Sequence, residues 1–186
     1  MSSKNNMYLA LLRGINVGGN NIIKMVDLKK CFEDMGFTGV KTYIQSGNVV
    51  FESDYDNLSE LTDTIENQLS STFNYKSKVV VVSKNQLETV IKSAPETFGE
   101  NKDEYRYDVL FLMPNFVPDD ILNSISPREG VDRMWAGERV VYFSRLIERA
   151  ESSYLNKIVS TPIYKNITIR NWNTTSKLAA LMGIER

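Results

Sequence analysis

The sequence contains no histidine, a single cysteine and no long apolar run, and its charges almost cancel. Without histidine, Ser-His-Asp and Cys-His catalysis, a histidine general base and histidine-ligated zinc are all excluded. An enzyme made from this chain would have to use carboxylates, lysine, tyrosine, backbone amides or a bound hard metal. Whether the protein is an enzyme is therefore left open. The lone cysteine, Cys31, excludes a disulfide within the chain and fits a reducing compartment.

The charge balance and hydropathy limit the partners of the protein. The chain has 22 basic and 23 acidic residues, for a net charge of −1. Long-range attraction to nucleic acid or to an acidic membrane is not expected, although a local basic patch is compatible with this balance. The start of the chain is polar, and no apolar run approaches the roughly 18 residues needed to cross a bilayer. We therefore expect no membrane partner and a cytoplasmic location.

The apolar periodicity predicts the element order β-α-β-β-α-β in the first half of the chain. We expect strands over residues 7–13, 40–44, 49–51 and 79–82, and helices that begin at Met25 and after Asn57. Asn57 with Glu60 forms a capping-box pattern, and the turn residues 45–48 predict a hairpin between the two middle strands. Ser83 with Gln86 predicts a further helix, which Pro95 ends.

The second half repeats this element order without repeating the residues. We expect strands over residues 107–113, 131–135, 139–143 and 167–170, a helix with Pro118 at its first position, a helix from Ser152 or Ser153, and a last helix capped by Thr174. The sequence thus predicts an α+β fold with two ferredoxin-like (βαββαβ) subdomains, each followed by an extra helix. Residues 1–95 and 107–186 form the subdomains, and the charged segment 96–106 forms a linker. Because several strands are apolar on both faces, we expect the second face of each sheet to be covered by the appended helices or by the other half.

Three motifs occur in order along the chain: Leu11–Gly19 (LLRGINVGG), Gln45–Phe51 (QSGNVVF) and Thr168–Thr174 (TIRNWNT), the last followed by Lys177-Leu178. In these motifs the chain resembles a widespread bacterial family catalogued as domain of unknown function 1697, over about residues 7–181. The resemblance implies two ferredoxin-like subdomains, in agreement with the element order. It implies no activity and supplies no catalytic residues, because the family has no established function.

The glycine-rich loop that follows the first strand is the main candidate site. Arg13 stands at the end of that strand, where layered α/β structures often bind ligands, and Lys24 stands at the other end of the loop. The spacing fits neither a P-loop nor a dinucleotide-binding fingerprint. Consecutive amides in the Gly18-Gly19 turn can form an anion-binding nest. The alternative is a tight strand-to-helix turn with a structural arginine.

Two other segments complete the candidate site. Topology places Asn48, at the start of the third strand, near the end of the first strand, so Ser46 and Asn48 would converge on the glycine loop; the alternative is an ordinary hairpin turn. Near the end of the chain, Arg170, Trp172 and Lys177 offer two cations and an aromatic face that suit a phosphate and a base, but Trp172 also suits a packing role. The candidate ligand-binding residues are Arg13, Gly14, Asn16, Gly18, Gly19, Lys24, Ser46, Asn48, Arg170, Asn171, Trp172 and Lys177.

Two functions from different classes are compatible with these features. The first is binding of a small anionic or nucleotide-like ligand at the glycine-rich loop. The second is a protein- or single-stranded-RNA-interaction module that uses its sheet or hairpin surface. Aromatic residues Tyr8 and Phe51 on the central strands and a cluster of Arg133, Arg139 and Arg145 support it; near-neutral charge does not favour nucleic acid. The carboxylates form no recognisable metal site, and the sequence identifies neither a cofactor nor an oligomeric state.

Overall fold

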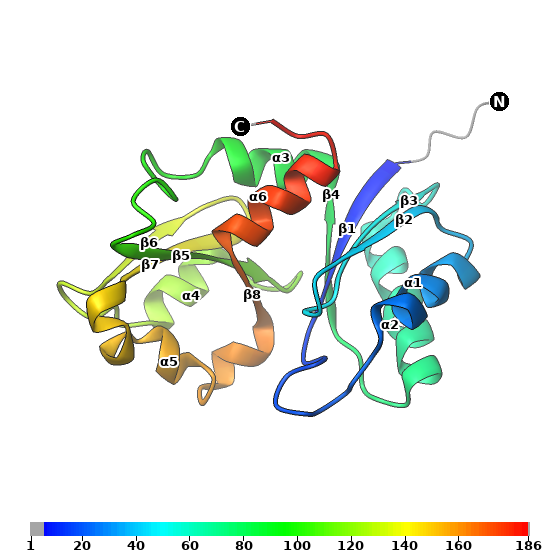
Figure 1. The fold of residues 1–186 in the computed structure, drawn as a ribbon, viewed down its shortest axis with the longest axis horizontal. Helices are drawn as coiled ribbons and strands as arrows, with labels where there is room; N and C mark the ends of the chain where they lie inside the picture. The colour runs from blue at the N-terminus through cyan, green and yellow to red at the C-terminus, as the bar shows by residue number, and fades with distance from the viewer. Residues whose placement is uncertain (1–5, 186) are drawn as a thin grey trace. The chain divides into compact units, whose positions relative to one another are not determined.

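The computed structural model describes residues 6–185, which divide into two compact units (Figure 1). The first unit contains the chain up to Leu87 together with Leu178–Glu185, and the second contains Glu88–Lys177. Within residues 6–185, no helix is both long enough and apolar enough to cross a membrane.

The first unit is a four-stranded antiparallel sheet with two helices on one face. Its elements are β1 (Asn6–Leu12), α1 (Met25–Asp34), β2 (Thr38–Tyr43), β3 (Asn48–Ser53), α2 (Leu58–Phe73), β4 (Val79–Ser83) and the start of α3 (Lys84–Lys92). The strands lie in the order β2-β3-β1-β4, and β1 is antiparallel to both of its neighbours. This order is that of the ferredoxin-like fold and confirms the predicted β-α-β-β-α-β arrangement.

The core of the first unit lies between the sheet and helices α1 and α2. Leu28 and Phe32 of α1 and Leu61 of α2 are fully buried at helical spacing. Tyr8 and Phe51 belong to this same core, with ring centroids 5.8 Å apart. These two rings lie on the face of the sheet that the helices cover, so they do not form the RNA-binding surface that the sequence offered as an alternative.

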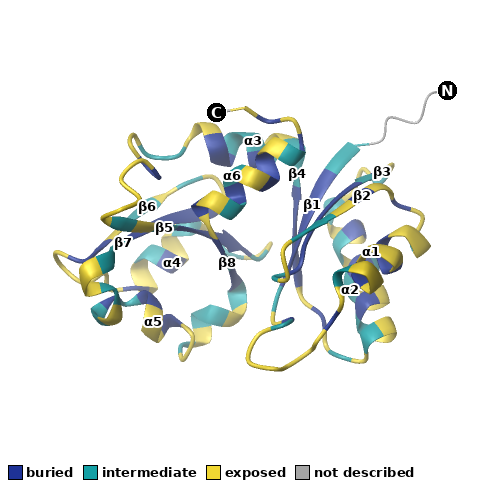
Figure 2. Ribbon diagram, in the orientation of Figure 1, coloured by how far each residue is buried: buried dark blue, intermediate teal, exposed yellow. Residues whose placement is uncertain are grey.

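Strands β1, β3 and β4 of the first sheet are buried on both faces, as their apolar sequences predicted, and the edge strand β2 is more exposed (Figure 2). Leu9 and Leu11 alternate with the core residues along β1, so they lie on the other face, and both are 0% exposed. Cys31 of α1 packs in the core, where its Sγ lies 3.7 Å from the hydroxyl of Thr72. Burial raises the pKa of the Cys31 thiol, which fits a packed side chain rather than a nucleophile.

The second unit repeats the arrangement with a sheet in the order β6-β7-β5-β8. Its elements are the end of α3, β5 (Tyr105–Leu112), α4 (Pro118–Ser124), β6 (Asp132–Ala136), β7 (Val140–Leu146), a 3₁₀ helix (Ile147–Ser152), α5 (Leu155–Ile158), a second 3₁₀ helix (Pro162–Asn166), β8 (Ile167–Asn171) and the start of α6 (Trp172–Leu181), whose end belongs to the first unit. One face of this sheet packs on α4 and α5 through apolar residues that include Leu110, Phe143 and Ile158.

The ends of two helices differ from expectation. The helix expected from Ser152 or Ser153 is the single turn α5 between two 3₁₀ helices. Thr174 does not cap the last helix: α6 starts directly after β8, and the side chain of Asn171 accepts the backbone N–H of Asn173 at 2.9 Å. An asparagine side chain at this position satisfies an N–H that the first turn leaves unpaired, so the helix begins before Thr174.

The segment 96–106, expected to form a linker, contains a buried anchor. Phe98 is 2% exposed and lies among aromatic rings of the second unit, and β5 already begins at Tyr105. The end of α3 joins the same unit, where the hydroxyl of Tyr142 donates to the carbonyl of Val90 at 2.6 Å. The second compact unit begins at Glu88, within α3.

Candidate functional site

The tip of the glycine-rich loop is a tight hairpin turn. The N–H of Asn20 donates to the carbonyl of Val17 at 3.0 Å, which closes a two-residue turn over Gly18 and Gly19. Both glycines have positive φ, at 58° and 78°. A two-residue turn with φ > 0 at both central positions strongly favours glycine. The turn itself therefore explains this pair of glycines.

Asn16 organises the rest of the loop. Its side-chain amide donates to the carbonyls of Ile23 and Gln45 at 3.0 and 2.8 Å, and its Oδ1 accepts the N–H of Ile23 at 2.8 Å. Asn16 also has a positive φ of 54°, which asparagine tolerates better than most residues. One side chain thus closes the loop and attaches it to the β2–β3 hairpin.

The predicted convergence of the loop with the hairpin is confirmed. Leu11 pairs with Asn48, and the N–H of Leu12 donates to the carbonyl of Gly47 at 2.9 Å. A Cβ on Gly47 would lie 2.6 Å from Cδ1 of Ile15, so the two segments are in close contact. Asn48 itself is 0% exposed and donates to Tyr43 and Ser46 within the hairpin. Asn48 therefore supports the hairpin from inside rather than facing solvent.

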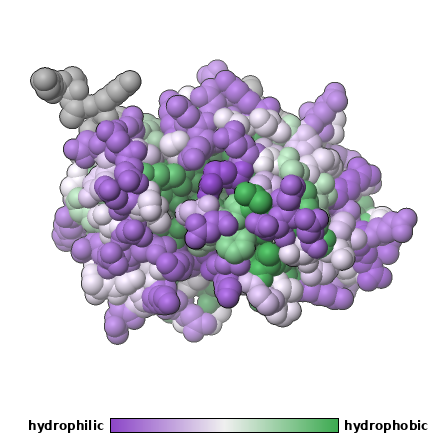
Figure 3. Space-filling view, turned by 180° about the vertical axis from the view of Figure 1, so that it is seen from behind, coloured by the Kyte–Doolittle hydropathy of each residue, from purple (hydrophilic) through white to green (hydrophobic). Residues whose placement is uncertain are grey.

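The outer surface of the loop is apolar as well as cationic. Lys24 and Gly14 are exposed and Arg13 is half-buried. Four large apolar side chains of this unit are also exposed: Val17 at 65%, Ile22 at 76%, Val26 at 69% and Ile44 at 48%. Figure 3 shows one face of the molecule, on which most residues are hydrophilic and a smaller number are hydrophobic. Scattered apolar residues are ordinary on a protein surface, but neighbours in one loop and helix start are typical of contact surfaces.

The candidate residues near the end of the chain belong to the second unit. Arg170 is 8% exposed, and its Nη1 donates to the carbonyl of Ile169 at 3.0 Å. Burial lowers the pKa of Arg170 to about 10, so the guanidinium stays charged at neutral pH. Trp172 is 3% exposed and packs against Phe98 with ring centroids 5.2 Å apart. Trp172 is thus a packing anchor, Asn171 caps α6, and Lys177 is exposed.

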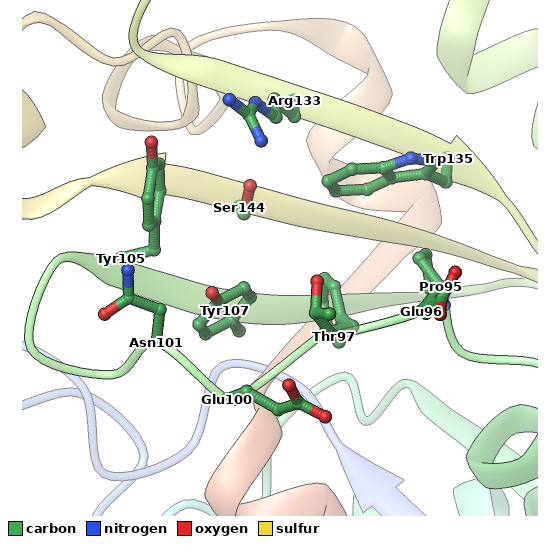
Figure 4. A pocket seen from close by; sticks show the side chains of 11 residues that line it. Pro95, Glu96, Thr97, Glu100, Asn101, Tyr105, Tyr107, Arg133, Trp135 and Ser144 are labelled. Carbon is green, nitrogen blue, oxygen red and sulfur yellow. The ribbon is translucent and has the colours of Figure 1, made fainter.

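A pocket that the sequence did not predict lies on the second sheet, on the face opposite α4 and α5. Tyr107, Ser144 and Arg133 are direct neighbours across β5, β7 and β6, so their side chains share this face. Ser144 is small, and the side chains around it are large. The difference in size leaves a cavity of about 360 Å³ with Ser144 at its floor (Figure 4).

Aromatic side chains and one polypeptide segment form the walls of this pocket. Tyr105 and Tyr107 stand on β5, and Trp135 stands with Arg133 on β6 (Figure 4). The segment 95–101 runs along one side and is held there by Phe98, whose ring lies 4.9 Å from that of Tyr107 and 5.9 Å from that of Trp135. The rings that line the pocket are therefore held by contacts with each other.

Backbone conformation in this segment depends on a close contact. Gly99 has a φ of 87°, and a Cβ at this position would overlap the ring of Trp172. Thr97 also has a positive φ, 64°, which is rare for a β-branched residue. Such strain persists only where surrounding structure imposes it, and it occurs often at binding sites.

The charged groups of the pocket are one guanidinium and two carboxylates. Arg133 lies over the ring of Tyr105, with its Cζ 5.5 Å from the ring centroid. Glu96 and Glu100 come from the segment that forms the side wall. Burial raises the pKa of Tyr107, so its phenol stays protonated at neutral pH. The arrangement offers aromatic faces for stacking and polar groups at the edges.

Sequence reasoning missed the pocket although part of its signal was present. Tyr105 and Tyr107, and Arg133 and Trp135, are pairs at i and i+2, which lie on one face of a strand. The sequence also predicted a cluster of Arg133, Arg139 and Arg145 on the β6–β7 hairpin, and this prediction is wrong for Arg133 and Arg145. Arg133 pairs with Ser144 while Arg145 pairs with Asp132 at the next register position, so the two arginines lie on opposite faces of the sheet.

Arg145 has a different partner on the helix-covered face. Its Nη2 lies 3.8 Å from Oδ2 of Asp108, and Nη1 donates to Asn156 at 3.1 Å. Burial raises the pKa of Asp108, and Arg145 opposes that rise. Across residues 6–185, no group of three or more Cys, Asp and Glu side chains is placed to hold a metal ion.

The fold defines an α+β protein made of two ferredoxin-like units, the second with an aromatic pocket on its sheet. The family model described as "Protein of unknown function (DUF1697)" matches residues 6–142, and the chain belongs to this family. The solved structure of conserved bacterial protein SP0830 from Streptococcus pneumoniae is similar over 96% of this chain and 99% of that chain, with a TM-score of 0.84 and 25% identity. No curated protein matches the sequence.

Proposed function

We propose that this protein binds a small, planar, nucleotide-like ligand, and that the ligand lies in the pocket on the second sheet. One observation carries the proposal: a cavity of about 360 Å³ lined by Tyr105, Tyr107 and Trp135 and bordered by an arginine stacked on one of these rings. Small-molecule sites commonly have volumes of about 300–1,000 Å³ and aromatic walls with a few polar groups.

The lining of the pocket suits a flat ring better than an aliphatic ligand. Each stacked base gains about 1–3 kcal/mol from an aromatic side chain in proteins that bind single-stranded nucleic acids. Arg133 adds a planar cation that stacks on aromatic faces. The hydroxyl of Ser144 at the floor and the carboxylates at the side add hydrogen-bonding partners for the edge of a ring.

The glycine-rich loop is the competing location for the same function. Arg13, Gly14 and Lys24 are at least partly exposed there, and Gly14 and Gly19 have open space where a Cβ would be. Against this location, the Gly18-Gly19 turn and the side chain of Asn16 are accounted for by the structure of the loop itself. We therefore place the ligand in the pocket and use the loop as the control.

Tryptophan fluorescence and thermal shift, measured with a panel of ligands, test the proposal. The chain has two tryptophans, and Trp135 lines the pocket, so a bound base should quench its emission. At about 100 times its dissociation constant, a ligand stabilises the protein by roughly 2.7 kcal/mol, or about 5–10 °C for a chain of this length. The panel contains nucleobases, nucleosides, nucleotides, phosphate and sulfate. The matched variants are Ser144→Leu, which fills the pocket, and Arg13→Ala, which alters the loop.

The two variants separate the two locations. Quenching and stabilisation that are lost in Ser144→Leu and kept in Arg13→Ala support the pocket. The reverse pattern moves the site to the glycine-rich loop. If no ligand in the panel alters fluorescence or melting temperature of the wild-type protein, the proposal of a nucleotide-like ligand is wrong.

A second candidate function is binding of a partner protein by the first unit. The exposed apolar side chains of Val17, Ile22, Val26 and Ile44 favour this function. Ile44 also has a φ of 49°, which is unusual for a β-branched residue. Substituting Ile22→Asp should abolish recovery of a partner protein in affinity capture and leave the melting temperature unchanged, because this side chain is 76% exposed. If the wild-type protein and the Ile22→Asp variant recover the partner equally, these side chains do not form the binding surface.

A further inference from the structure

The electrostatics of the pocket on the second sheet indicate which nucleotide-like molecule it takes. Of the residues that line it, Glu96 and Glu100 are acidic and Arg133 is basic, which amounts to two negative charges and one positive charge, or −1 in total. A site for phosphate groups normally has the opposite balance, with several cations or the amides of a helix N-terminus aimed at the oxygens.

The lining of the pocket has a single cation. Arg133 lies over the face of Tyr105, with its Cζ 5.5 Å from the ring centroid, and this stacking leaves the N–H groups at the edge of the guanidinium available. A phosphate in the pocket would therefore meet one guanidinium and two carboxylates. The same phosphate would approach the carboxylates on the side wall, and like charges a few ångströms apart repel.

The same carboxylates favour hydrogen-bond donors. The exocyclic amines of bases and the hydroxyls of ribose are donors, and ionised carboxylates only accept. The volume of about 360 Å³ is near the lower end of the range for small-molecule sites, so the pocket has room for one base with its sugar. Glu96 and Glu100 stand on the segment that Phe98 holds against the sheet, and both residues are exposed beside the cavity.

We infer that the pocket selects an uncharged nucleoside or free nucleobase over the corresponding phosphorylated nucleotide, with Glu96 and Glu100 as the residues that exclude phosphate. This inference rests on the proposed function, since it names the class of ligand for the same site. It differs from the anionic ligand that the glycine-rich loop suggested, because the charged residues that line this pocket sum to a negative charge.

Titration calorimetry of the full chain with the four common ribonucleosides, their 5′-monophosphates and ATP tests the inference. The best nucleoside should bind about tenfold or more tightly than its monophosphate, and ATP should bind most weakly. In Glu96→Gln/Glu100→Gln this difference should fall to about twofold to threefold, mainly through tighter binding of the monophosphate. The matched control Glu148→Gln/Glu151→Gln removes two exposed carboxylates of the same unit that do not line the pocket and should keep the wild-type difference.

The salt dependence of binding tests the inference independently, because dissolved ions screen the repulsion between a phosphate and the two carboxylates. Raising ionic strength from about 0.01 to 0.15 M shortens the Debye length from about 30 to about 8 Å. In the wild-type protein this change should tighten binding of the monophosphate and leave the nucleoside unchanged. Binding of the nucleoside should be lost in Ser144→Leu.

The outcomes separate this inference from the proposal on which it rests. If a monophosphate binds as tightly as its nucleoside, or more tightly, and this binding is lost in Ser144→Leu, the inferred selectivity is wrong and the pocket is a nucleotide site. A preference for the nucleoside that persists unchanged in Glu96→Gln/Glu100→Gln overturns the role of the two carboxylates. If neither nucleosides nor nucleotides bind in a manner that depends on Ser144, the proposed function and this inference are both wrong.

Discussion

Replacing Phe98 by alanine tests whether the segment 95–101 belongs to the second core. The Phe98 side chain is 2% exposed. Its ring meets those of Tyr107, Trp172, Tyr142 and Trp135 at interplanar angles between 68° and 86° and centroid distances of 4.9–5.9 Å. Edge-to-face pairs of this kind contribute about 0.5–1.5 kcal/mol each beyond the burial of apolar surface. A residue of a charged linker would make no such contacts.

The expected loss in the free energy of unfolding is about 3 kcal/mol. Phenylalanine to alanine in a core costs about 3–5 kcal/mol, and we take the lower end because the adjoining pocket lets neighbouring rings relax into the space. For a chain of this length, 1 kcal/mol corresponds to about 2–4 °C, so the melting temperature should fall by about 6–12 °C. This loss is a large share of the 5–15 kcal/mol by which native proteins are stable.

Urea unfolding followed by tryptophan fluorescence is the appropriate assay. Trp135 and Trp172 both lie in the second unit, so their emission reports the unfolding of that unit. The matched control is Glu100→Ala in the same segment, where the side chain is exposed and the change should stay within about 0.5 kcal/mol. If Phe98→Ala also changes stability by less than about 0.5 kcal/mol, the segment is a linker and our account of the pocket wall fails.

Further substitutions test the glycine loop and one buried phenol. Gly47→Ala should destabilise the protein by about 2 kcal/mol or more in thermal unfolding, because the backbone φ is +75° and the added Cβ would clash with Ile15. Gly14→Ala is the control: it has open space at its Cβ and should cost only about 1 kcal/mol. Equal losses in the two variants would contradict the close contact at Gly47. Asn16→Asp keeps the acceptor for Ile23 and removes the donor of two hydrogen bonds, so the free energy of unfolding should fall by about 1–2 kcal/mol. An unchanged melting temperature would show that these hydrogen bonds do not stabilise the loop. Burial raises the pKa of Tyr142 from 10.0 to about 12, so the folded state favours the protonated phenol. Its contribution to stability is complete below about pH 10 and is lost as the pH rises through about 12. In Tyr142→Phe, the free energy of unfolding measured in urea should therefore decline less at alkaline pH. An identical decline in the two proteins would assign the effect to other groups.

Local patterns in the sequence predicted the elements and much of their arrangement. Helical periodicity placed Leu28, Phe32 and Leu61 in the first core, and turn chemistry placed the hairpin at Gly47. The order of the elements was enough to predict that Asn48 meets the glycine loop, because strand direction in a βαββαβ sheet determines which strand ends are adjacent. These predictions succeeded because each depends on residues close in sequence or on topology alone.

The role of particular side chains in the candidate site was harder to predict. Asn16 and Asn48 were proposed as ligand-binding residues, and the structure uses both as internal hydrogen-bonding partners of the loop and hairpin. A polar side chain in a loop has the same sequence signal whether it meets a ligand or a backbone carbonyl. Only the positions of its partners distinguish the two roles, and those partners are up to 29 residues away.

The sequence by itself determined the two sheets, their helices and the absence of histidine chemistry, because periodicity, turn residues and composition act locally or over the whole chain. Tertiary structure alone decided the pocket. Its existence depends on the register that aligns Tyr107, Ser144 and Arg133 across three strands, and on Phe98, which holds an aperiodic segment against the sheet. Strand register and the burial of one ring are set by contacts between residues far apart in the chain, and a linear pattern carries no record of them.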